Sequence, residues 1–264
     1  EGYMPGREVV ILGSGDIGLI MARRMTLEGA KVLGVFEIQP YASGLPRNIE
    51  QCLNDYQIPL HLSHSVTEIC GVDRLESVVI SEVDDRLQPI PGTEKEYPCD
   101  TLILSVGLIP ENELTWMAGA KQDDGTKGAS VDENFQTTVP GVFAAGNVLH
   151  VHDLVDFVSM EAEELADGAA RYIKEGALPD CGLAITGDSM VGQLTPARFS
   201  GTGNVTVSFR MRKPVRNCTV ELWQGDHLVK QKKFPKALPA EMIQIGLKPE
   251  ELNEKDNLEV RVVC

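Results

Sequence analysis

Gly13, Gly15 and Gly18 are spaced as G-x-G-x-x-G, the pattern of a turn that binds the pyrophosphate of a dinucleotide. In such a turn the first glycine permits a tight bend, and the second lets the backbone approach the phosphates. The third allows the following helix to pack closely on a strand. The free N–H groups and positive dipole end of that helix then face the negative phosphates. The spacing alone is a weak indication, because glycine-rich turns are common, so the flanking elements decide its meaning.

Glu37 follows the glycines at the distance expected of a ribose-binding carboxylate, about 20 residues further on. A carboxylate there can accept hydrogen bonds from both adenosine ribose hydroxyls, whereas the 2′-phosphate of NADP would meet its negative charge. The sequence therefore favours NAD over NADP. Arg47 could approach a 2′-phosphate, but it lies well beyond the strand, and a solvated arginine at a helix start is the simpler interpretation. The alternative for the whole motif is a vestigial fold that no longer binds nucleotide.

Two strands and a helix must hold these residues in place. The sequence predicts a buried strand at EVVIL, a helix over 16–28 and the next strand at KVLGVFE. A second helix is expected over 46–55, then short strands in PLHLS, SVTEI and LESVVISEV and a buried strand in CDTLILSVG. This alternation predicts an α/β fold, a Rossmann-like dinucleotide-binding domain whose parallel sheet is covered by helices.

The rest of the chain changes character twice. From residue 107 a Gly- and Asp-rich stretch leads to VPGVFAAGN and then to a long helix over 153–175, which Gly176 and Pro179 end. From about residue 182, short β-rich segments separated by turns predict a small antiparallel β-sandwich with Phe209 and Trp223 in its core. We therefore expect three parts, at 5–106, 107–181 and 182–264.

Charge and composition exclude several classes of partner. The chain has 39 acidic and 24 basic residues and a formal charge of −15, so its surface repels nucleic acid and anionic lipid. It has no apolar run near the roughly 20 residues that cross a bilayer and no signal peptide at its start, which predicts no membrane insertion and a cytoplasmic location. The six cysteines are scattered without a C-x-x-C pair, so we expect reduced thiols.

Three motifs in order carry a family resemblance: GSGDIG with Glu37, CDTLILSVGLIP, and TTVPGVFAAGN. Together, over about residues 5–178, they resemble FAD/NAD(P)-dependent flavoproteins of the pyridine nucleotide-disulfide oxidoreductase type, in which an NAD domain is inserted into an FAD domain. Within that family, MARRMTLEGAKV and GNVLHVHDLVDFVSMEAE look most like the flavoproteins associated with anaerobic glycerol-3-phosphate dehydrogenase or with sarcosine- and opine-oxidising complexes.

The resemblance implies an enzyme that transfers hydride between NAD(H) and FAD, in which the cofactors carry the chemistry and no catalytic side chain is identified. It implies that 107–181 is the C-terminal part of the FAD domain, that Gly107 and Pro110 mark the return to it, and that 142–147 form a strand and turn beside FAD. The helix after Asp153 would point its N-terminus at the cofactor. The cofactor-binding residues expected on all these grounds are Gly13, Ser14, Gly15, Asp16, Ile17, Gly18, Glu37, Gly107, Gly146 and Asn147.

The chain departs from the family pattern in four ways. Asn147 stands where the family has Asp, and Ile20 where many members have a Glu that orients the nicotinamide amide. The redox cysteine pair is absent, and the FAD-binding glycine motif would lie in a segment before this chain. We therefore expect a C-terminal fragment that binds NAD(H), holds no FAD, is colourless and is inactive by itself. The alternative, which Ile20 favours, is a non-catalytic NAD(H)-binding subunit or sensor whose β domain docks a partner subunit.

His150 and His152, two residues apart and followed by Asp153, raise the question of a metal site. A third ligand is not recognisable, so no metal is assigned. A charge partner for the flavin is a second interpretation, and ordinary turn and cap roles, with Asp153 as N-cap of the long helix, are the simplest. The acidic residues Glu161, Glu163 and Glu164 are expected on a solvated helix face, and the pairs Asp84-Asp85 and Asp123-Asp124 in turns.

Overall fold

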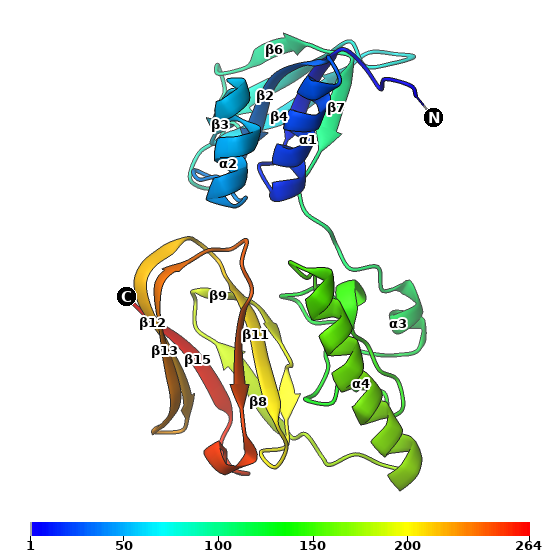
Figure 1. The fold of residues 1–264 in the computed structure, drawn as a ribbon, viewed down its shortest axis with the longest axis vertical. Helices are drawn as coiled ribbons and strands as arrows, with labels where there is room; N and C mark the ends of the chain where they lie inside the picture. Colours follow the sequence, from blue (N-terminus) through cyan, green and yellow to red (C-terminus); the bar gives the residue numbers. More distant parts are fainter. Residues whose placement is uncertain (1) are drawn as a thin grey trace. The chain divides into compact units, whose positions relative to one another are not determined.

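The computed structural model describes residues 2–264 and divides the chain into two compact units (Figure 1), one ending at Gly107 and one beginning at Leu108. The prediction of three parts is finer than this division, and the boundary expected at 181/182 stays a prediction. Among residues 2–264, no helix combines the length and the apolar composition that a membrane-spanning helix needs.

The first unit is built on a parallel sheet of strand order β3-β2-β1-β7. The strands are β1 (Glu8–Leu12), β2 (Lys31–Glu37), β3 (Leu60–Leu62) and β7 (Thr101–Leu104). Val9 and Ile11 of β1 point to the face where helices α1 (Asp16–Leu27) and α2 (Pro46–Cys52) pack, because side chains alternate along a strand. The predicted α/β fold with a parallel sheet is confirmed.

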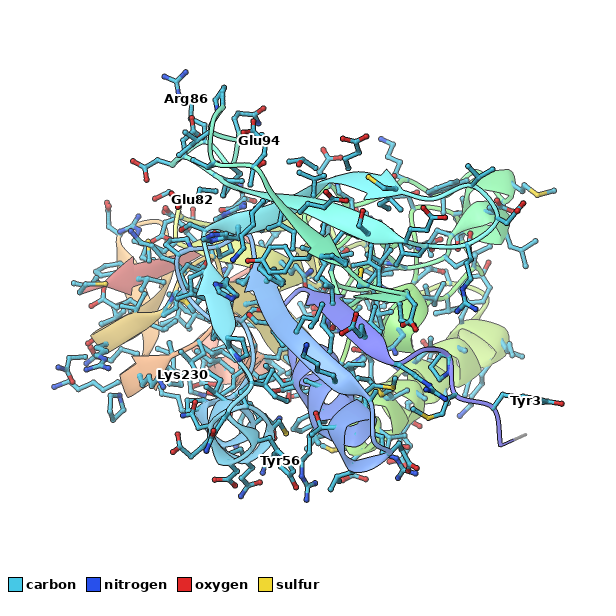
Figure 2. All side chains as sticks on the ribbon, turned by 90° about the horizontal axis from the view of Figure 1, so that it is seen from above. Tyr3, Tyr56, Glu82, Arg86, Glu94 and Lys230 are labelled. Atoms are coloured by element: carbon cyan, nitrogen blue, oxygen red, sulfur yellow. The ribbon has the colours of Figure 1, made fainter. Side chains whose placement is uncertain are left out.

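An antiparallel sheet covers the other face of the parallel sheet, where the sequence predicted helices. Its strands are β4 (His64–Cys70), β5 (Ser77–Glu82) and β6 (Lys95–Pro98), in the order β4-β5-β6. Val10 and Phe36 pack here against Val78 and Ile80. The turn-rich stretch predicted around Asp84 is the β5–β6 loop, which also carries the labelled residues Arg86 and Glu94 (Figure 2).

Helix α2 is shorter than predicted. It ends at Cys52 and is followed by the 3₁₀ turn η1 (Asn54–Tyr56), which Gln57 ends in a left-handed conformation with φ 55°. The extended helix expected over 46–55 is therefore two short elements.

The first part of the second unit holds α3 (Glu113–Met117), a series of turns, the 3₁₀ turn η2 (Gly146–Val148) and the long helix α4 (Val155–Glu175). Helix α4 ends as predicted at Gly176, which has φ 80°. The strand predicted within 142–147 is wrong. Phe143 makes one isolated bridge to Gln136, and the chain then turns into η2.

A two-sheet β structure completes the second unit. One sheet has the order β10-β8-β15-β12-β13 and the other β14-β11-β9. Their bounds are β8 (Leu183–Gly187), β9 (Val191–Thr195), β10 (Arg198–Phe199), β11 (Val205–Met211), β12 (Val215–Gln224), β13 (His227–Ala237), β14 (Ile243–Leu247) and β15 (Leu258–Val263), with the 3₁₀ turn η3 (Pro249–Glu251) between the last two strands. Strands β8 and β15 pair in parallel, so the sheets are not purely antiparallel as predicted.

The core of the β structure contains Phe209, which is fully buried as predicted. Trp223 is a correction. It is only half-buried, its indole N–H donates to Glu221, and the Arg261 guanidinium lies 5.1 Å from its ring. Leu222 and Gln224 point inward beside it, so the alternation of β12 turns Trp223 to the outer face.

Candidate functional site

The turn between β1 and α1 is held in a conformation that only glycine adopts easily. Gly13 has φ 98°, and its N–H donates to the Phe36 carbonyl at 2.7 Å, which joins the turn to β2. A Cβ on Gly13 would lie 2.1 Å from the carbonyl oxygen of Ser105, just after β7. Both the backbone angle and the close approach of Ser105 therefore require glycine here.

Gly18 lets helix α1 pack directly on this turn. A Cβ at Gly18 would lie 2.6 Å from the Gly13 carbonyl oxygen and 2.9 Å from the Ser105 Cβ. Contacts this short do not occur between real Cβ atoms and backbone, so a larger residue would push the helix away from the strand. This is the packing role that the sequence predicts for the third glycine.

Gly15 differs from the other two glycines because nothing in the protein requires it. Its angles, φ −63° and ψ 163°, are open to any residue, and a Cβ would meet no atom nearer than 3.9 Å. Gly15 is the N-cap of α1, and no side chain caps the helix, whose first N–H groups have no partners within it. The open space over Gly15 at a helix N-terminus is where an anionic group would fit.

Gly18→Ala is expected to destabilise the first unit, because overpacking against backbone costs about 1–3 kcal/mol. Gly15→Ala is the matched control, since its methyl group has free space. Both tryptophans lie in the second unit, so amide hydrogen exchange of β1 and β2 is the suitable measurement. We expect faster exchange in Gly18→Ala than in Gly15→Ala, and equal rates would contradict the packing role of Gly18.

The carboxylate of Glu37 is buried and lies against the glycine turn. Glu37 is 5% exposed, and its Oε2 accepts hydrogen bonds from Ser14 N at 3.0 Å, Ser14 Oγ at 2.5 Å and Ser43 Oγ at 3.1 Å. Its Oε1 accepts a hydrogen bond from Gln39 N at 2.9 Å. A carboxylate oxygen has two lone pairs, so Oε1 keeps capacity for a ribose hydroxyl. The negative group is thus fixed in orientation beside the turn.

The loop after β2 folds back over the glycine turn. Ser43 N donates to Ser14 Oγ at 2.9 Å, and Gly44 N donates to the Ser14 carbonyl at 2.9 Å. Asp16 Oδ1 accepts from Leu45 N at 2.8 Å and from Asn48 Nδ2 at 2.7 Å. The side chains of Ser14 and Asp16 are therefore committed to protein contacts, and so are the backbone N–H and carbonyl of Ser14. What remains for a cofactor is the backbone at the start of α1.

The remaining site residues of the first unit lie on exposed surface. Ile17 is 69% and Ile20 46% exposed on α1, so Ile20 offers an apolar side chain where the family resemblance expects a carboxylate. Gly107 has φ 96°, and a Cβ there would meet no atom within 4 Å. Arg47 is exposed on α2, as expected of a solvated arginine. Sequence reasoning missed Ser43 and Asn48, because only the folded loop and the start of α2 bring them to the turn.

Gly146 and Asn147 form a tight turn in the second unit. Gly146 is buried with φ 72°, and its N–H donates to Glu161 Oε1 at 2.6 Å. Asn147 is exposed, and its Oδ1 accepts from His152 N at 3.1 Å. Asp153 does not cap α4, since the N-cap is Leu154 without a side-chain cap. Asp153 instead pairs with Arg210 and accepts from Met242 N at 2.8 Å.

Glu161 was predicted on a solvated helix face, and this prediction is wrong. Glu161 is 8% exposed rather than solvated, whereas Glu163 and Glu164 are exposed as predicted. Its Oε2 lies 2.6 Å from His150 Nε2, and its Oε1 lies 3.2 Å from His152 Nε2. Burial raises the pKa of Glu161, but the hydrogen bonds from the two histidines outweigh burial and lower it to about 2. The carboxylate is therefore charged in the interior.

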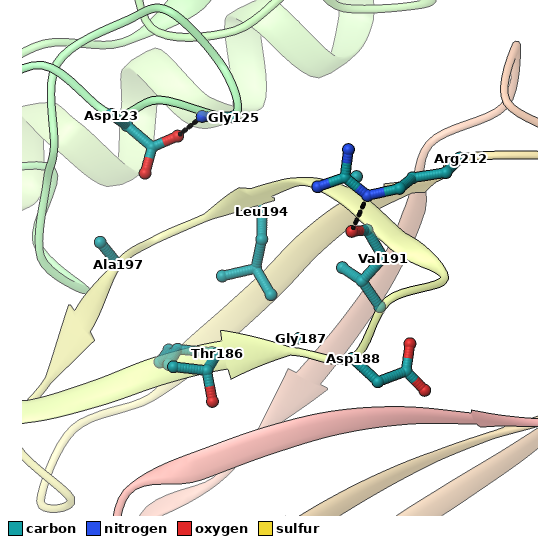
Figure 3. A pocket seen from close by; sticks show the side chains of 11 residues that line it. Asp123, Gly125, Thr186, Gly187, Asp188, Val191, Leu194, Ala197 and Arg212 are labelled. Atoms are coloured by element: carbon teal, nitrogen blue, oxygen red, sulfur yellow. Dashed lines mark hydrogen bonds between the residues drawn. The ribbon is translucent and has the colours of Figure 1, made fainter. Parts of the chain in front are cut away.

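Two further features have no recognisable chemistry. A hollow of about 230 Å³ in the second unit lies between β8, β9 and the 123–125 turn (Figure 3). Its acids are satisfied by backbone, with Gly125 N donating to Asp123, and Met190 N and Val262 N to Asp188. All six cysteines are free, so the described residues contain no disulfide.

The sequence matches the family model described as pyridine nucleotide-disulphide oxidoreductase over residues 2–171. An NADH oxidase of Methanocaldococcus jannaschii is 28% identical over 224 residues, 78% of this chain and 45% of that protein. A mitochondrial dihydrolipoyl dehydrogenase of Caenorhabditis elegans is 29% identical over 155 residues, 56% of this chain and 30% of that protein. A thioredoxin reductase structure from Lactococcus lactis matches at a TM-score of 0.56 and 20% identity, covering 64% of this chain and 54% of that one, which supports the fold alone. The chain spans less than half the length of these two curated relatives.

Proposed function

The chain belongs to the pyridine nucleotide-disulphide oxidoreductase family, and we propose that it is the NADH-binding part of a flavin-dependent oxidoreductase. When both cofactors are bound, hydride passes between the nicotinamide and the flavin, so the protein supplies position and electrostatics. The observation that carries the proposal is the open space over Gly15 beside the buried carboxylate of Glu37. This pairing offers a place for a pyrophosphate next to an acceptor for a ribose.

The residues of the first unit have separate tasks in this proposal. Gly15 and the N-terminus of α1 hold the pyrophosphate, because no side chain of the described residues caps the helix and a Cβ at Gly15 would meet no atom nearer than 3.9 Å. Glu37 accepts the adenosine ribose hydroxyls and disfavours a 2′-phosphate. Gly13 and Gly18 keep the helix close enough for this geometry. The expected cofactor is therefore NAD(H).

The second unit would contribute part of the flavin site. The left-handed conformation of Gly146 and the exposed amide of Asn147 support the expectation that this turn contacts FAD. Gly107, with free space at its Cα, is proposed to lie near the nicotinamide half. Asn147 can bond a ribityl hydroxyl but offers no charge. The proposal has three further parts. The chain is related to the flavoproteins of glycerol-3-phosphate, sarcosine or opine oxidation, it works with a partner subunit, and it is located in the cytoplasm.

Anaerobic stopped-flow mixing with NADH tests the proposed function. The protein is used as it is made in the cell and is loaded with FAD. After it is mixed with NADH, we expect its visible flavin absorbance to disappear, because NADH reduces the flavin. Reduction by dithionite is the control that shows the flavin to be redox-competent. A flavin that dithionite bleaches and saturating NADH does not would contradict the proposal.

A non-catalytic NAD(H) sensor is the second candidate, and Ile20 favours it. The exposed isoleucine cannot orient the nicotinamide amide by a hydrogen bond. In a sensor, NADH would bind without reducing flavin, so the same stopped-flow experiment, combined with a binding measurement, separates the two candidates.

A further inference from the structure

His150, His152 and Glu161 form a buried cluster at the start of α4, in the second unit. The two imidazoles come from the segment that leads from η2 to the helix, and the carboxylate comes from the helix itself. The side chains of both histidines are 1% exposed and that of Glu161 is 8% exposed. The three donor atoms all lie within 4.8 Å of one another. We propose that this cluster binds a divalent transition-metal ion, with Zn²⁺ as the best fit.

The first argument is charge. A buried carboxylate needs a positive partner, because an uncompensated charge in the interior is costly. The partners of the Glu161 carboxylate are the Gly146 N–H and two imidazoles, none of which carries a permanent charge. The cluster can be neutralised by a proton on an imidazole or by a metal ion.

The second argument is the donor set. Two imidazole nitrogens and one carboxylate oxygen are ligands that Zn²⁺ and its first-row neighbours accept at about 2 Å. Two ligand atoms of one metal ion lie farther apart than the 2.6 Å between His150 Nε2 and Glu161 Oε2. The ion would therefore replace the proton that these two atoms share, and the distance between them would increase slightly. Three protein ligands leave a tetrahedral ion one position for water.

The third argument is the support around the cluster. The Gly146 N–H fixes Glu161 Oε1 at 2.6 Å, the kind of second contact that orients a metal-binding carboxylate. His152 Nδ1 is buried and has no hydrogen-bond partner. A buried unpartnered nitrogen next to two converging donors indicates that a water or ion completes the site. Glu161 is the third ligand that the sequence alone did not reveal.

Calorimetric titration of ZnCl₂ into the chelator-stripped chain tests the site, with the Cys264→Ser variant as background because Cys264 is the exposed thiol. We expect one saturable site per chain. Glu161→Gln and His152→Gln are each expected to weaken it at least about 100-fold, since even outer contacts of metal ligands are worth 10–100-fold. Glu161 also accepts the Gly146 N–H, so Glu161→Gln could disturb this turn. His152→Gln removes a ligand without changing that contact.

Glu163→Gln and His227→Gln are the matched controls, since both side chains are exposed and lie outside the cluster. They should leave Zn²⁺ affinity unchanged. Co²⁺ added to the same protein should give visible absorption bands that His152→Gln abolishes. The proposal is overturned if no saturable binding occurs, or if binding survives in both cluster variants. In either case, His150, His152 and Glu161 are held together by a shared proton and not by a metal ion. These outcomes do not depend on NADH or flavin.

Discussion

Gly15→Val is expected to leave the first unit folded and to weaken NADH binding by at least about 100-fold, which is roughly 2.7 kcal/mol. The backbone angles of Gly15 suit valine, and the protein has no atom within 3.4 Å of its Cβ position. Loss of the glycine N-cap costs about 1 kcal/mol or less. The branched side chain fills the space that we assign to the pyrophosphate. Titration calorimetry with NADH measures the effect.

The control for Gly15→Val is a measurement that the first unit remains folded. Hydrogen exchange of β1 and β2 should stay close to that of the unsubstituted chain, in contrast to Gly18→Ala. An unchanged NADH affinity in a folded Gly15→Val protein would show that the pyrophosphate does not lie over Gly15.

Glu37→Gln is expected to weaken NADH binding by about tenfold, or 1.4 kcal/mol, and to bring the affinities for NADH and NADPH close together. The amide oxygen can keep the hydrogen bonds from Ser14 and Ser43. The amide nitrogen then takes the place of Oε1, so the ribose acceptor, the acceptor of Gln39 N and the negative charge are all lost. Calorimetry with the two cofactors in parallel measures the change.

Glu68→Gln is the matched control, because Glu68 is an exposed glutamate of β4 in the same unit. It should leave both affinities unchanged. If Glu37→Gln leaves the preference for NADH over NADPH intact, the ribose assignment of Glu37 is wrong.

The core of the candidate site was predictable because its signals are local. An apolar strand, three spaced glycines and an acid at the end of the next strand all fall within residues 8–37, and the observed β1, α1 and β2 agree with them to within a residue. The hydrogen bonds of Ser43 and Asn48 were not predictable, since the path of the loop after β2 depends on tertiary contacts.

The cover of the parallel sheet shows a second limit. Apolar alternation identifies β4 and β5 as strands, but β6 was not predicted, and alternation does not determine which strands pair. The sequence predicted a parallel sheet covered by helices, whereas the folded chain places an antiparallel sheet against Val10 and Phe36 on one face.

Glu161 was missed although a signal existed. Leu165 and Gly168 follow it at spacings of four and seven residues, which places all three on one face of α4, and that face is the packed one. Glu163 falls on the opposite face and is exposed, whereas Glu164 is an i, i+3 neighbour of Glu161 that is exposed nonetheless. Treating the three acids as one group hid the difference between Glu161 and Glu163, which the helical period separates.

The central claim is that residues 8–37 form an NAD(H) site, and calorimetric titration of the unsubstituted chain with NADH and with NADPH tests it most directly. We expect one NADH site per chain and at least about tenfold weaker binding of NADPH, because Glu37 would face the 2′-phosphate. The absence of NADH binding to the folded chain, or tighter binding of NADPH than of NADH, would contradict the claim.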